Sequence, residues 1–177
     1  MSKFITFLKT FREFPLKYLY VSLIVFVLDQ LTKIIVRYYK PYEFEVIGKF
    51  FRLTHVENDV GAFGLGTGFS DPLNFILFRI APIIVLFIVF FMLRSSKHKL
   101  EAITFSLVIG GALGNITDRL IFGSVTDFFD VIWPLKIFGW ERWPTFNIAD
   151  SSIVVGVILL LIYTIFIERS LPKGEIE

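Results

Sequence analysis

The chain has 177 residues, of which 55% are hydrophobic and 19% are charged, and it contains no cysteine. A soluble domain carries about 45–50% apolar and about 25% charged residues. The composition therefore excludes a disordered chain, and the lack of cysteine excludes a disulfide-stabilised secreted domain and thiol chemistry. A net charge of +2 gives no basic footprint for nucleic acid, so no nucleic-acid partner is expected.

Four stretches are long and apolar enough to cross a bilayer as helices, which takes about 20 residues. They cover about residues 17–36, 73–93, 102–122 and 147–167. No soluble domain of ordinary size fits into the remainder. The sequence therefore predicts an all-α membrane fold, a four-transmembrane-helix bundle that forms one domain over residues 1–177. We expect the first span to be retained rather than cleaved as a signal peptide, because Asp29 and Lys33 stand where a cleavage region would be.

The distribution of basic residues predicts the orientation of the bundle. The link at 94–101 (RSSKHKLE) and the N-terminal segment are rich in Lys and Arg, whereas eight of the 16 acidic residues fall in 37–72 and 123–146. By the positive-inside rule, both termini and the 94–101 link are cytoplasmic, and the other two segments face outward.

Both outward segments carry recognisable patterns. Residues 43–56 (EFEVIGKFFRLTHV) are rich in β-branched and aromatic residues around Gly48, which predicts a short β-hairpin. The second segment holds all three tryptophans. Indole rings favour the headgroup layer, so this loop is expected at the membrane interface, although packing on the top of the bundle explains the rings equally well.

Ionisable residues inside membrane spans are costly and are by default candidates for a functional site. The spans contain six of them: Asp29, Lys33, Arg79, Asp118, Arg119 and Asp150. With a rise of about 1.5 Å per residue, they lie about 18–26 Å from the cytoplasmic ends of their helices. All therefore fall in the outer third of the bilayer. Four helices of alternating direction thus predict one polar site that opens towards the outer face.

Several of these residues also have structural interpretations. Asp29 and Lys33 are spaced i, i+4 and can form a self-neutralised pair, with Lys33 extending outward to the interface. Asp118 and Arg119 can form a local ion pair. Arg79 is either a headgroup anchor or a partner for a carboxylate. Gly110 and Gly114 form a small-xxx-small pair that lets another helix approach closely.

Carboxylates that meet in such a site suggest acid–base chemistry. Two close carboxylates share a proton, so one can activate water while the other donates to a scissile carbonyl, as in aspartic proteases. The sequence leaves several pairings open among four residues: Asp118, Asp127, Asp130 and Asp150.

Other classes fit less well. His55 and His98 lie on opposite sides of the membrane in this topology, so no histidine zinc site is expected, although an all-oxygen metal site stays open. A transporter predicts charges spread through the depth of the bundle, and a membrane scaffold predicts only locally neutralised pairs. An intramembrane peptidase explains the single polar level and the surplus carboxylates better.

Five segments, in this order, resemble the lipoprotein signal peptidase (signal peptidase II) family. They are DQLTK (29–33), NDVGAF (58–63), GGALGNITDR (110–119), VTDFFD (125–130) and FNIADSSI (146–153). The resemblance implies a four-helix membrane bundle with an outward β-cradle and a partly helical second outer loop. It implies a metal-independent, cofactor-free aspartic endopeptidase of the bacterial cytoplasmic membrane. Its substrates would be prolipoproteins, cut just before a diacylglyceryl-modified cysteine, and its other partners would be membrane lipids.

The resemblance also assigns roles to individual residues. Asp127 and Asp150 would be the catalytic dyad, and Asn115 and Arg119 would hold the substrate backbone. Asp118 would be structural support. Four further residues would shape the site and its lipid end, as substrate-binding residues: Asn58, Asn147, Asp29 and Lys33. We expect the enzyme to act as a monomer.

One position departs from the family pattern. The family has glycine two residues after the loop asparagine, where this chain has Val60. Valine is strained at positive φ, so the loop is expected to follow a different path here.

Overall fold

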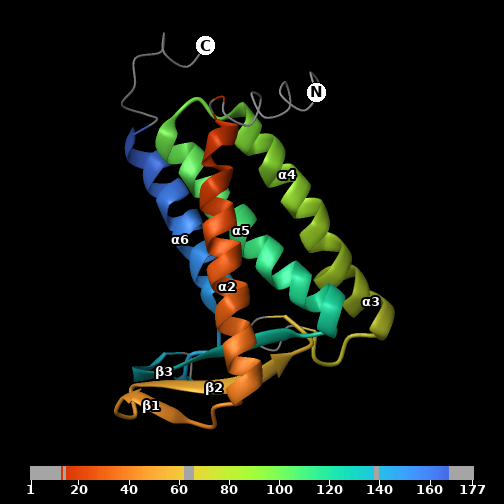
Figure 1. Cartoon of the computed structure of the whole chain (residues 1–177), viewed down its shortest axis with the longest axis vertical. Helices are drawn as coiled ribbons and strands as arrows, with labels where there is room; N and C mark the ends of the chain where they lie inside the picture. The colour runs from red at the N-terminus through yellow and green to blue at the C-terminus, as the bar shows by residue number, and fades with distance from the viewer. Residues whose placement is uncertain (1–12, 14, 62–65, 138–139, 168–177) are drawn as a thin grey trace.

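The computed structural model describes residues 13, 15–61, 66–137 and 140–167, with backbone alone for 133–137, 140–141 and 167. A bundle of long helices stands on a small β-sheet at one end (Figure 1). The helices are η1 (Leu16–Tyr18) with α2 (Leu19–Tyr39), then α3 (Asp71–Phe75) with η3 (Ile76–Ile80) and α4 (Ala81–Ser95), then α5 (Lys99–Phe122), and finally α6 (Ile148–Ile162) with η4 (Tyr163–Ile167). The strands are β1 (Phe44–Ile47), β2 (Phe51–Asn58), β3 (Val125–Ile137) and β4 (Trp140–Arg142).

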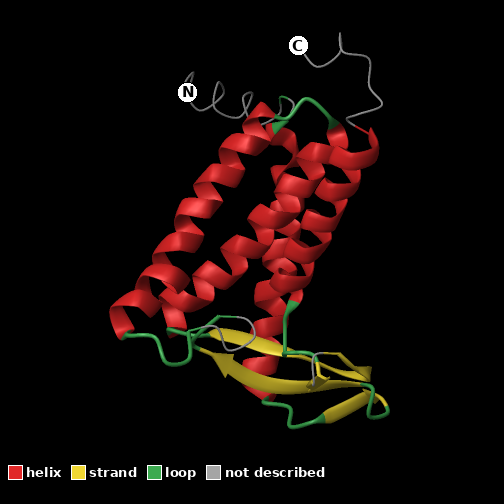
Figure 2. Cartoon of the chain, turned by 180° about the vertical axis from the view of Figure 1, so that it is seen from behind, coloured by secondary structure: helices red, strands yellow, loops and turns green. Residues whose placement is uncertain are grey.

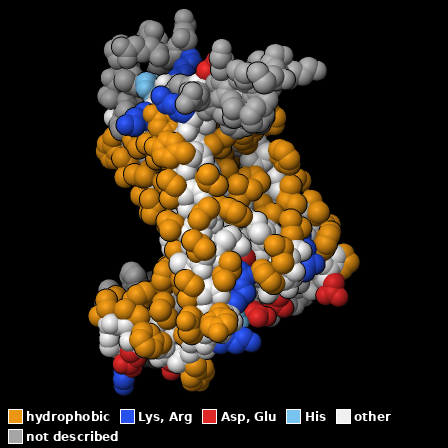
Figure 3. All heavy atoms as spheres, viewed as in Figure 1, with side chains coloured by type: hydrophobic (Ala, Val, Ile, Leu, Met, Phe, Trp, Pro, Cys, Tyr) orange, Lys and Arg blue, Asp and Glu red, His pale blue; other side chains and the backbone are white. Residues whose placement is uncertain are grey.

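The predicted spans are confirmed as helices. Four helical segments are long and apolar enough to cross a membrane: Leu16–Tyr39, Asp71–Ser95, Lys99–Phe122 and Ile148–Phe166. Their bounds differ from the predicted ones by at most three residues. Leu, Ile, Val and Phe side chains cover the outside of these helices (Figure 3). Such a surface is matched to hydrocarbon rather than water, and the chain is a multi-pass membrane protein.

Helix α5 is the centre of the bundle. Half of its most apolar stretch is buried, against 11% for the span that contains α4. Glycines allow its neighbours to approach closely: a Cβ on Gly110 would lie 2.8 Å from the Ser22 carbonyl oxygen of α2, and a Cβ on Gly114 would overlap the Asp29 carboxylate. The prediction that Gly110 and Gly114 serve helix packing is therefore confirmed.

The sheet is antiparallel and four-stranded, in the order β1-β2-β3-β4. The predicted hairpin is present, and Gly48 turns it with a φ of +47°. Strand β2 pairs with the first half of β3, so that Val56 lies opposite Asp127. The sheet crosses the ends of α2 and α5 (Figure 2).

The second outer loop differs from the expectation. The family resemblance implies a partly helical loop, but its described residues form strands β3 and β4 rather than a helix. Val125, Thr126 and Phe128 favour extended backbone, and β2 offers a row of unpaired amides and carbonyls that β3 satisfies.

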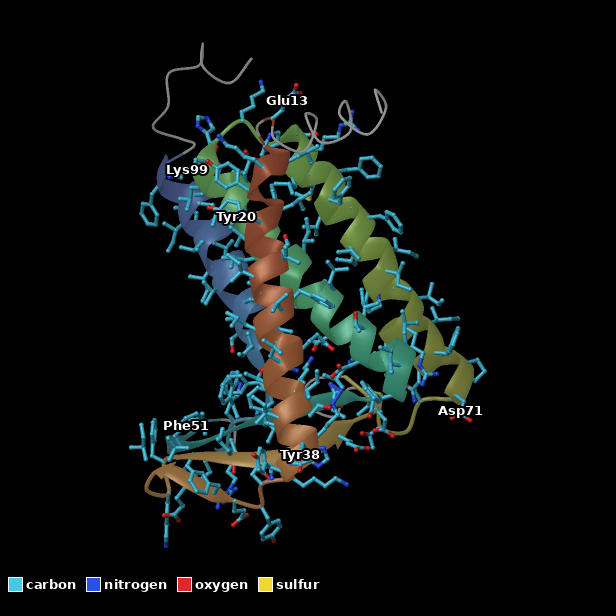
Figure 4. The ribbon with its side chains drawn as sticks, viewed as in Figure 1. Glu13, Tyr20, Tyr38, Phe51, Asp71 and Lys99 are labelled. Carbon is cyan, nitrogen blue, oxygen red and sulfur yellow. The ribbon has the colours of Figure 1, made fainter. Side chains whose placement is uncertain are left out.

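The two ends of the bundle differ in character. Lys99 lies at one end, and Tyr38 and Asp71 lie at the other, beside the sheet (Figure 4). Near Lys99, five residues form a buried apolar cluster: Tyr18, Leu93, Ala102, Phe105 and Ile109. Buried charged side chains gather instead at the sheet end, among them Asp29, Lys33 and Asp118. The predicted single polar level is thus confirmed.

Candidate active site

Asp127 and Asp150 face one cavity at the junction of the sheet and the helices. Asp127 lies near the start of β3, and Asp150 is in the first turn of α6. The cavity has a volume of about 520 Å³, and most of its wall is apolar. It is lined by Asn58, Asn115, Arg119, Val125, Asp127, Trp143, Pro144, Thr145, Phe146, Asp150, Ser151, Ile153, Val154 and Val155.

Amide groups hold both carboxylates. Asp127 accepts hydrogen bonds from the side-chain amides of Asn58 (3.0 Å) and Asn147 (2.8 Å). Asp150 accepts one from the Asn115 amide (2.7 Å) and one from the backbone N–H of Asn147 (3.2 Å). These donors fix the orientation of the carboxylates without neutralising their charge.

The other two candidate aspartates have cationic partners. Asp118 pairs with Lys33 (3.2 Å) and Arg37 (3.0 Å). Asp130 pairs with Arg52 and Arg142, both at 2.6 Å, and so links strands of the sheet. Among the described residues, Asp127 and Asp150 are the aspartates that share the cavity and have only amide donors. The predicted local ion pair between Asp118 and Arg119 is wrong, because Asp118 points to α2 instead.

The environment of Asp127 favours its protonated form. Burial, and secondly the charge of Asp150, raise the pKa of Asp127 to about 7, while the amides of Asn58 and Asn147 and the charge of Lys33 act in the opposite direction. A carboxyl group with this pKa both gives and accepts a proton near neutral pH.

Arg119 is the cation of the cavity wall. Its Nη2 donates to the carbonyl oxygen of Val60 (3.3 Å), and its buried Nε has no hydrogen-bond partner among the described residues. Val60 itself avoids the strain expected at a glycine position. The non-glycine residues with positive φ in the described ranges are Lys40 and Glu43.

Asp29 and Lys33 lie beneath the cavity rather than in its wall. Both are fully buried, and their side chains pair at 2.9 Å, as the i, i+4 spacing predicts. The alternative in which Lys33 extends outward is wrong, because the neighbouring Asp29, Asp118 and Asn115 provide its partners inside the bundle.

The contacts described for Arg79 are with a backbone carbonyl and a ring rather than with a carboxylate, and its role as a headgroup anchor stays a prediction. Its Nη2 donates to the carbonyl oxygen of Gly123 (3.2 Å), the residue that caps the end of α5. Its guanidinium also lies 5.5 Å from the centre of the Phe75 ring. Arg79 therefore joins the sheet end of the α4 span to α5.

A second apolar groove reaches the same polar residues from another side. It has a volume of about 370 Å³ and runs between α4, α5 and α6 to Asn115 and Arg119. The two hollows together give the polar centre two apolar approaches from the membrane side.

The described residues contain no group of three His, Cys, Asp or Glu side chains close enough to hold a metal ion. His55 lies on β2, and His98 precedes α5 at the opposite end of the bundle.

Comparison with known proteins identifies the family. The family described as "Signal peptidase (SPase) II" matches residues 21–166. A lipoprotein signal peptidase of Borreliella afzelii is 40% identical over 153 residues, and one of Borrelia garinii subsp. bavariensis is 42% identical, each alignment covering 84% of this chain and 88% of the relative. The chain belongs to the signal peptidase II family. Membership makes it a protease, and the family removes signal peptides from prolipoproteins.

The fold agrees with solved structures. Two structures described as a bacterial membrane enzyme, at 2.3 and 1.9 Å resolution, have TM-scores of 0.73 and 0.70 to this chain at 32% and 31% identity. They cover 90% and 87% of this chain, and the matches span 94% and 96% of their own lengths. The chain therefore shares its fold with these bacterial membrane enzymes over most of its length.

Two residues that contact this candidate site were not singled out from the sequence. Gln30 donates to Asp118 (3.2 Å), to Asp29 (3.1 Å) and to the Gly114 carbonyl oxygen (3.1 Å), and Arg37 pairs with Asp118. A signal for Arg37 exists, since 29, 33 and 37 follow the i, i+4 spacing along one helix face.

Proposed function

We propose that the chain is an aspartic endopeptidase in which Asp127 and Asp150 are the catalytic carboxylates. The observation that carries the proposal is that both line one cavity and accept hydrogen bonds from amides, whereas Asp118 and Asp130 are committed to cations. The family supports proteolysis, and this pair supplies the acid and the base that peptide hydrolysis needs.

The proposed reaction uses one proton shared between the two carboxylates. Asp127, with its pKa of about 7, donates to the scissile carbonyl oxygen, while ionised Asp150 takes a proton from the attacking water. A C–O bond forms to give a tetrahedral diol. The C–N bond then breaks as the amine leaves with a proton from the dyad, and Asp127 regains its proton from the diol hydroxyl.

Two wall residues are placed to hold the substrate backbone. Arg119 offers its unpartnered Nε to a substrate carbonyl oxygen, and Asn115, which already contacts Asp150, keeps the peptide at the level of the dyad. Asn58 and Asn147 shape the opposite side through their contacts with Asp127.

We propose that the substrates are diacylglyceryl-modified prolipoproteins and that the bond cut is the one just before the lipidated cysteine. The apolar cavity wall from Ile153 to Val155 and the groove beside α4 both suit a substrate that is held in the bilayer. We propose that the enzyme lies in the bacterial cytoplasmic membrane, with both termini cytoplasmic and the site towards the outer face. The basic 94–101 link lies at the end opposite the cavity, which supports this orientation.

The test is cleavage of a lipidated prolipoprotein peptide in detergent by Asp127→Asn and Asp150→Asn variants. Each should abolish turnover in a protein that still folds, while Asp71→Asn, an exposed carboxylate at the start of α3, should retain it. Chelators should leave the wild-type rate unchanged, whereas loss with EDTA and recovery with a divalent ion would favour a metal mechanism. A near-normal rate in either dyad variant would overturn the assignment.

The same assay tests the substrate. Removal of the diacylglyceryl group should strongly reduce kcat/KM, because the lipid sets the depth at which the scissile bond lies. Equal cleavage of lipidated and unlipidated peptide would indicate a general intramembrane aspartic peptidase.

A further inference from the structure

Lys33 is the centre of a buried network below the cavity. Its ammonium group lies 2.9 Å from an Asp29 carboxylate oxygen, 3.2 Å from an Asp118 carboxylate oxygen and 2.9 Å from the Asn115 side-chain oxygen. The side chains of Lys33, Asp29 and Asp118 have no exposed surface. With Arg37 on Asp118, the network holds two carboxylates and two cations and is neutral.

One arm of the network reaches the helix that carries Asp150. The Asp29 carboxylate accepts the backbone N–H of Ala149 (2.9 Å), which is one of the first-turn amides that α6 itself cannot satisfy. Ala149 directly precedes Asp150 in the chain. Asn115, which accepts from Lys33, also donates to the Asp150 carboxylate. Asp150 is therefore tied to Lys33 through its backbone and through its side chain.

The other arm reaches the strand that carries Asp127. The Asp118 carboxylate accepts the backbone N–H of Thr126 (3.0 Å), and Thr126 directly precedes Asp127. The oxygen that binds this amide is the one that also binds Lys33. The strand is thereby anchored to α5 and α2 at the position next to the carboxylate.

We infer that Lys33 is a positioning residue that sets the relative placement of Asp127 and Asp150, acting through Asp118 on one side and through Asp29 and Asn115 on the other. This inference rests on the proposed dyad. In this inference Lys33 and Asp29 act on the two carboxylates from below the cavity, since neither residue lines the cavity wall.

The charge of Lys33 has a second effect that makes the inference measurable. It lowers the pKa of Asp127, against burial and the charge of Asp150. The groups that act on Asp127 by charge or hydrogen bond are Asn58 on β2, Asn147 at the N-cap of α6, Asp150 on α6, Lys33 on α2 and Arg119 on α5. Loss of the Lys33 charge should therefore move the titration of Asp127 to higher pH.

The experiment compares Lys33→Met and Asp118→Asn with Ser22→Ala. Ser22 lies on the same helix as Lys33 and donates to the Ser106 carbonyl oxygen of α5 (2.7 Å) away from the dyad, so its loss removes a buried contact of the same helix pair. Because Lys33→Met leaves an unbalanced buried carboxylate, Lys33→Met combined with Asp29→Asn provides a charge-balanced second variant. Each protein is measured for kcat, KM and thermal stability. The titration of Asp127 is followed by NMR of ¹³C-aspartate, assigned with Asp127→Asn.

For Lys33→Met and for the charge-balanced variant, we expect kcat to fall at least tenfold with little change in KM. In Lys33→Met, the titration of Asp127 should also move to higher pH. Ser22→Ala should lower thermal stability alone. Wild-type kcat and an unchanged Asp127 titration in either folded Lys33 variant would overturn the inference. A displaced titration combined with full activity of Asp127→Asn would uphold the network but overturn the dyad, so the two proposals fail separately.

Discussion

Asn147 and Asp150 cap one another at the start of α6. The Asn147 side-chain oxygen accepts the backbone N–H of Asp150 (2.9 Å), and an Asp150 carboxylate oxygen accepts the backbone N–H of Asn147 (3.2 Å). This reciprocal pattern satisfies two amides of the helix terminus and fixes the Asp150 side chain at the same time. The side-chain amide nitrogen of Asn147 donates to Asp127 (2.8 Å), to the Asn115 side-chain oxygen (3.1 Å) and to the Thr126 carbonyl oxygen (3.3 Å).

Asn147→Ser should separate these two roles. Serine caps a helix about as well as asparagine, so thermal stability should fall less than in Asn147→Ala. The donor to Asp127 is lost, and kcat should fall by roughly tenfold or more, the size expected for a charge-assisted hydrogen bond. Asn147→Ala should lose both roles, with an added loss of about 0.5–2 kcal/mol in stability. Equal kcat in the serine variant and the wild type would contradict the role of this donor.

The rate of cleavage should fall as pH rises through about 7. Burial raises the pKa of Asp127 from 3.8 to about 7, and the proposed mechanism needs a proton on the dyad. Above this pH the dyad loses its last proton and cannot protonate the scissile carbonyl. A kcat that continued to increase between about pH 7 and pH 9 would be incompatible with Asp127 as the acid.

The raised pKa of Asp127 should also make the free energy of unfolding depend on pH. Between pH 3.8 and about 7, folded Asp127 binds a proton that the unfolded chain does not bind. The free energy of unfolding should therefore decline as pH rises through this range, and the loss should be complete above it. Asp127→Asn should show a smaller decline, which thermal unfolding at pH 5 and pH 8 would measure. An identical pH dependence in the two proteins would argue against a raised pKa in the folded state.

Gly114→Ala should lower both stability and kcat, although Gly114 is not itself one of the proposed site residues. The added Cβ would overlap the Asp29 carboxylate and would lie 3.2 Å from the Ala149 Cβ. We expect a destabilisation of about 1–3 kcal/mol, together with a lower kcat because Asp29 holds the amide next to Asp150. Gly156→Ala is the control, because its Cβ would crowd Val108 and the Thr104 carbonyl oxygen, away from the site. It should lose stability but keep its kcat when corrected for the folded fraction.

The proposed orientation predicts opposite reporter signals at two places. A reporter fused after Glu177 should behave as cytoplasmic. One inserted at Gly68, which has open space around its Cβ position at the sheet end, should behave as exported. The reverse pattern would place the cavity on the side that exported substrates do not reach.

The periodic and compositional features were predictable from the sequence. The spans could be located because a run of about 20 apolar residues is typical of a membrane-spanning helix. The common level of Asp29, Asp118 and Asp150 followed from helix rise and alternating direction alone. The β-hairpin around Gly48 was likewise visible in its β-branched and aromatic residues.

The pairing of side chains could not be predicted in the same way. Asp118 and Arg119 are neighbours in sequence, but on a helix they point in different directions, so Asp118 meets Lys33 while Arg119 meets Val60. Strand β3 was missed because its partner β2 lies about 70 residues earlier, and the pairing that stabilises it is not a local property. Rotamers of Asn58, Asn115 and Asn147 depend on the complete site.

The two carboxylates of the cavity belong to parts of the protein in different surroundings. Asp150 is attached to a helix that crosses the membrane, and Asp127 is attached to a sheet that lies beyond the ends of the helices (Figure 1). Their separation therefore depends on how deep the bundle sits relative to the sheet. A bilayer that is thicker or thinner than the spans tilts or displaces its helices. Acyl-chain length in the surrounding lipid should therefore affect the rate of cleavage, because only one of the two proposed catalytic carboxylates is attached to a membrane-spanning helix.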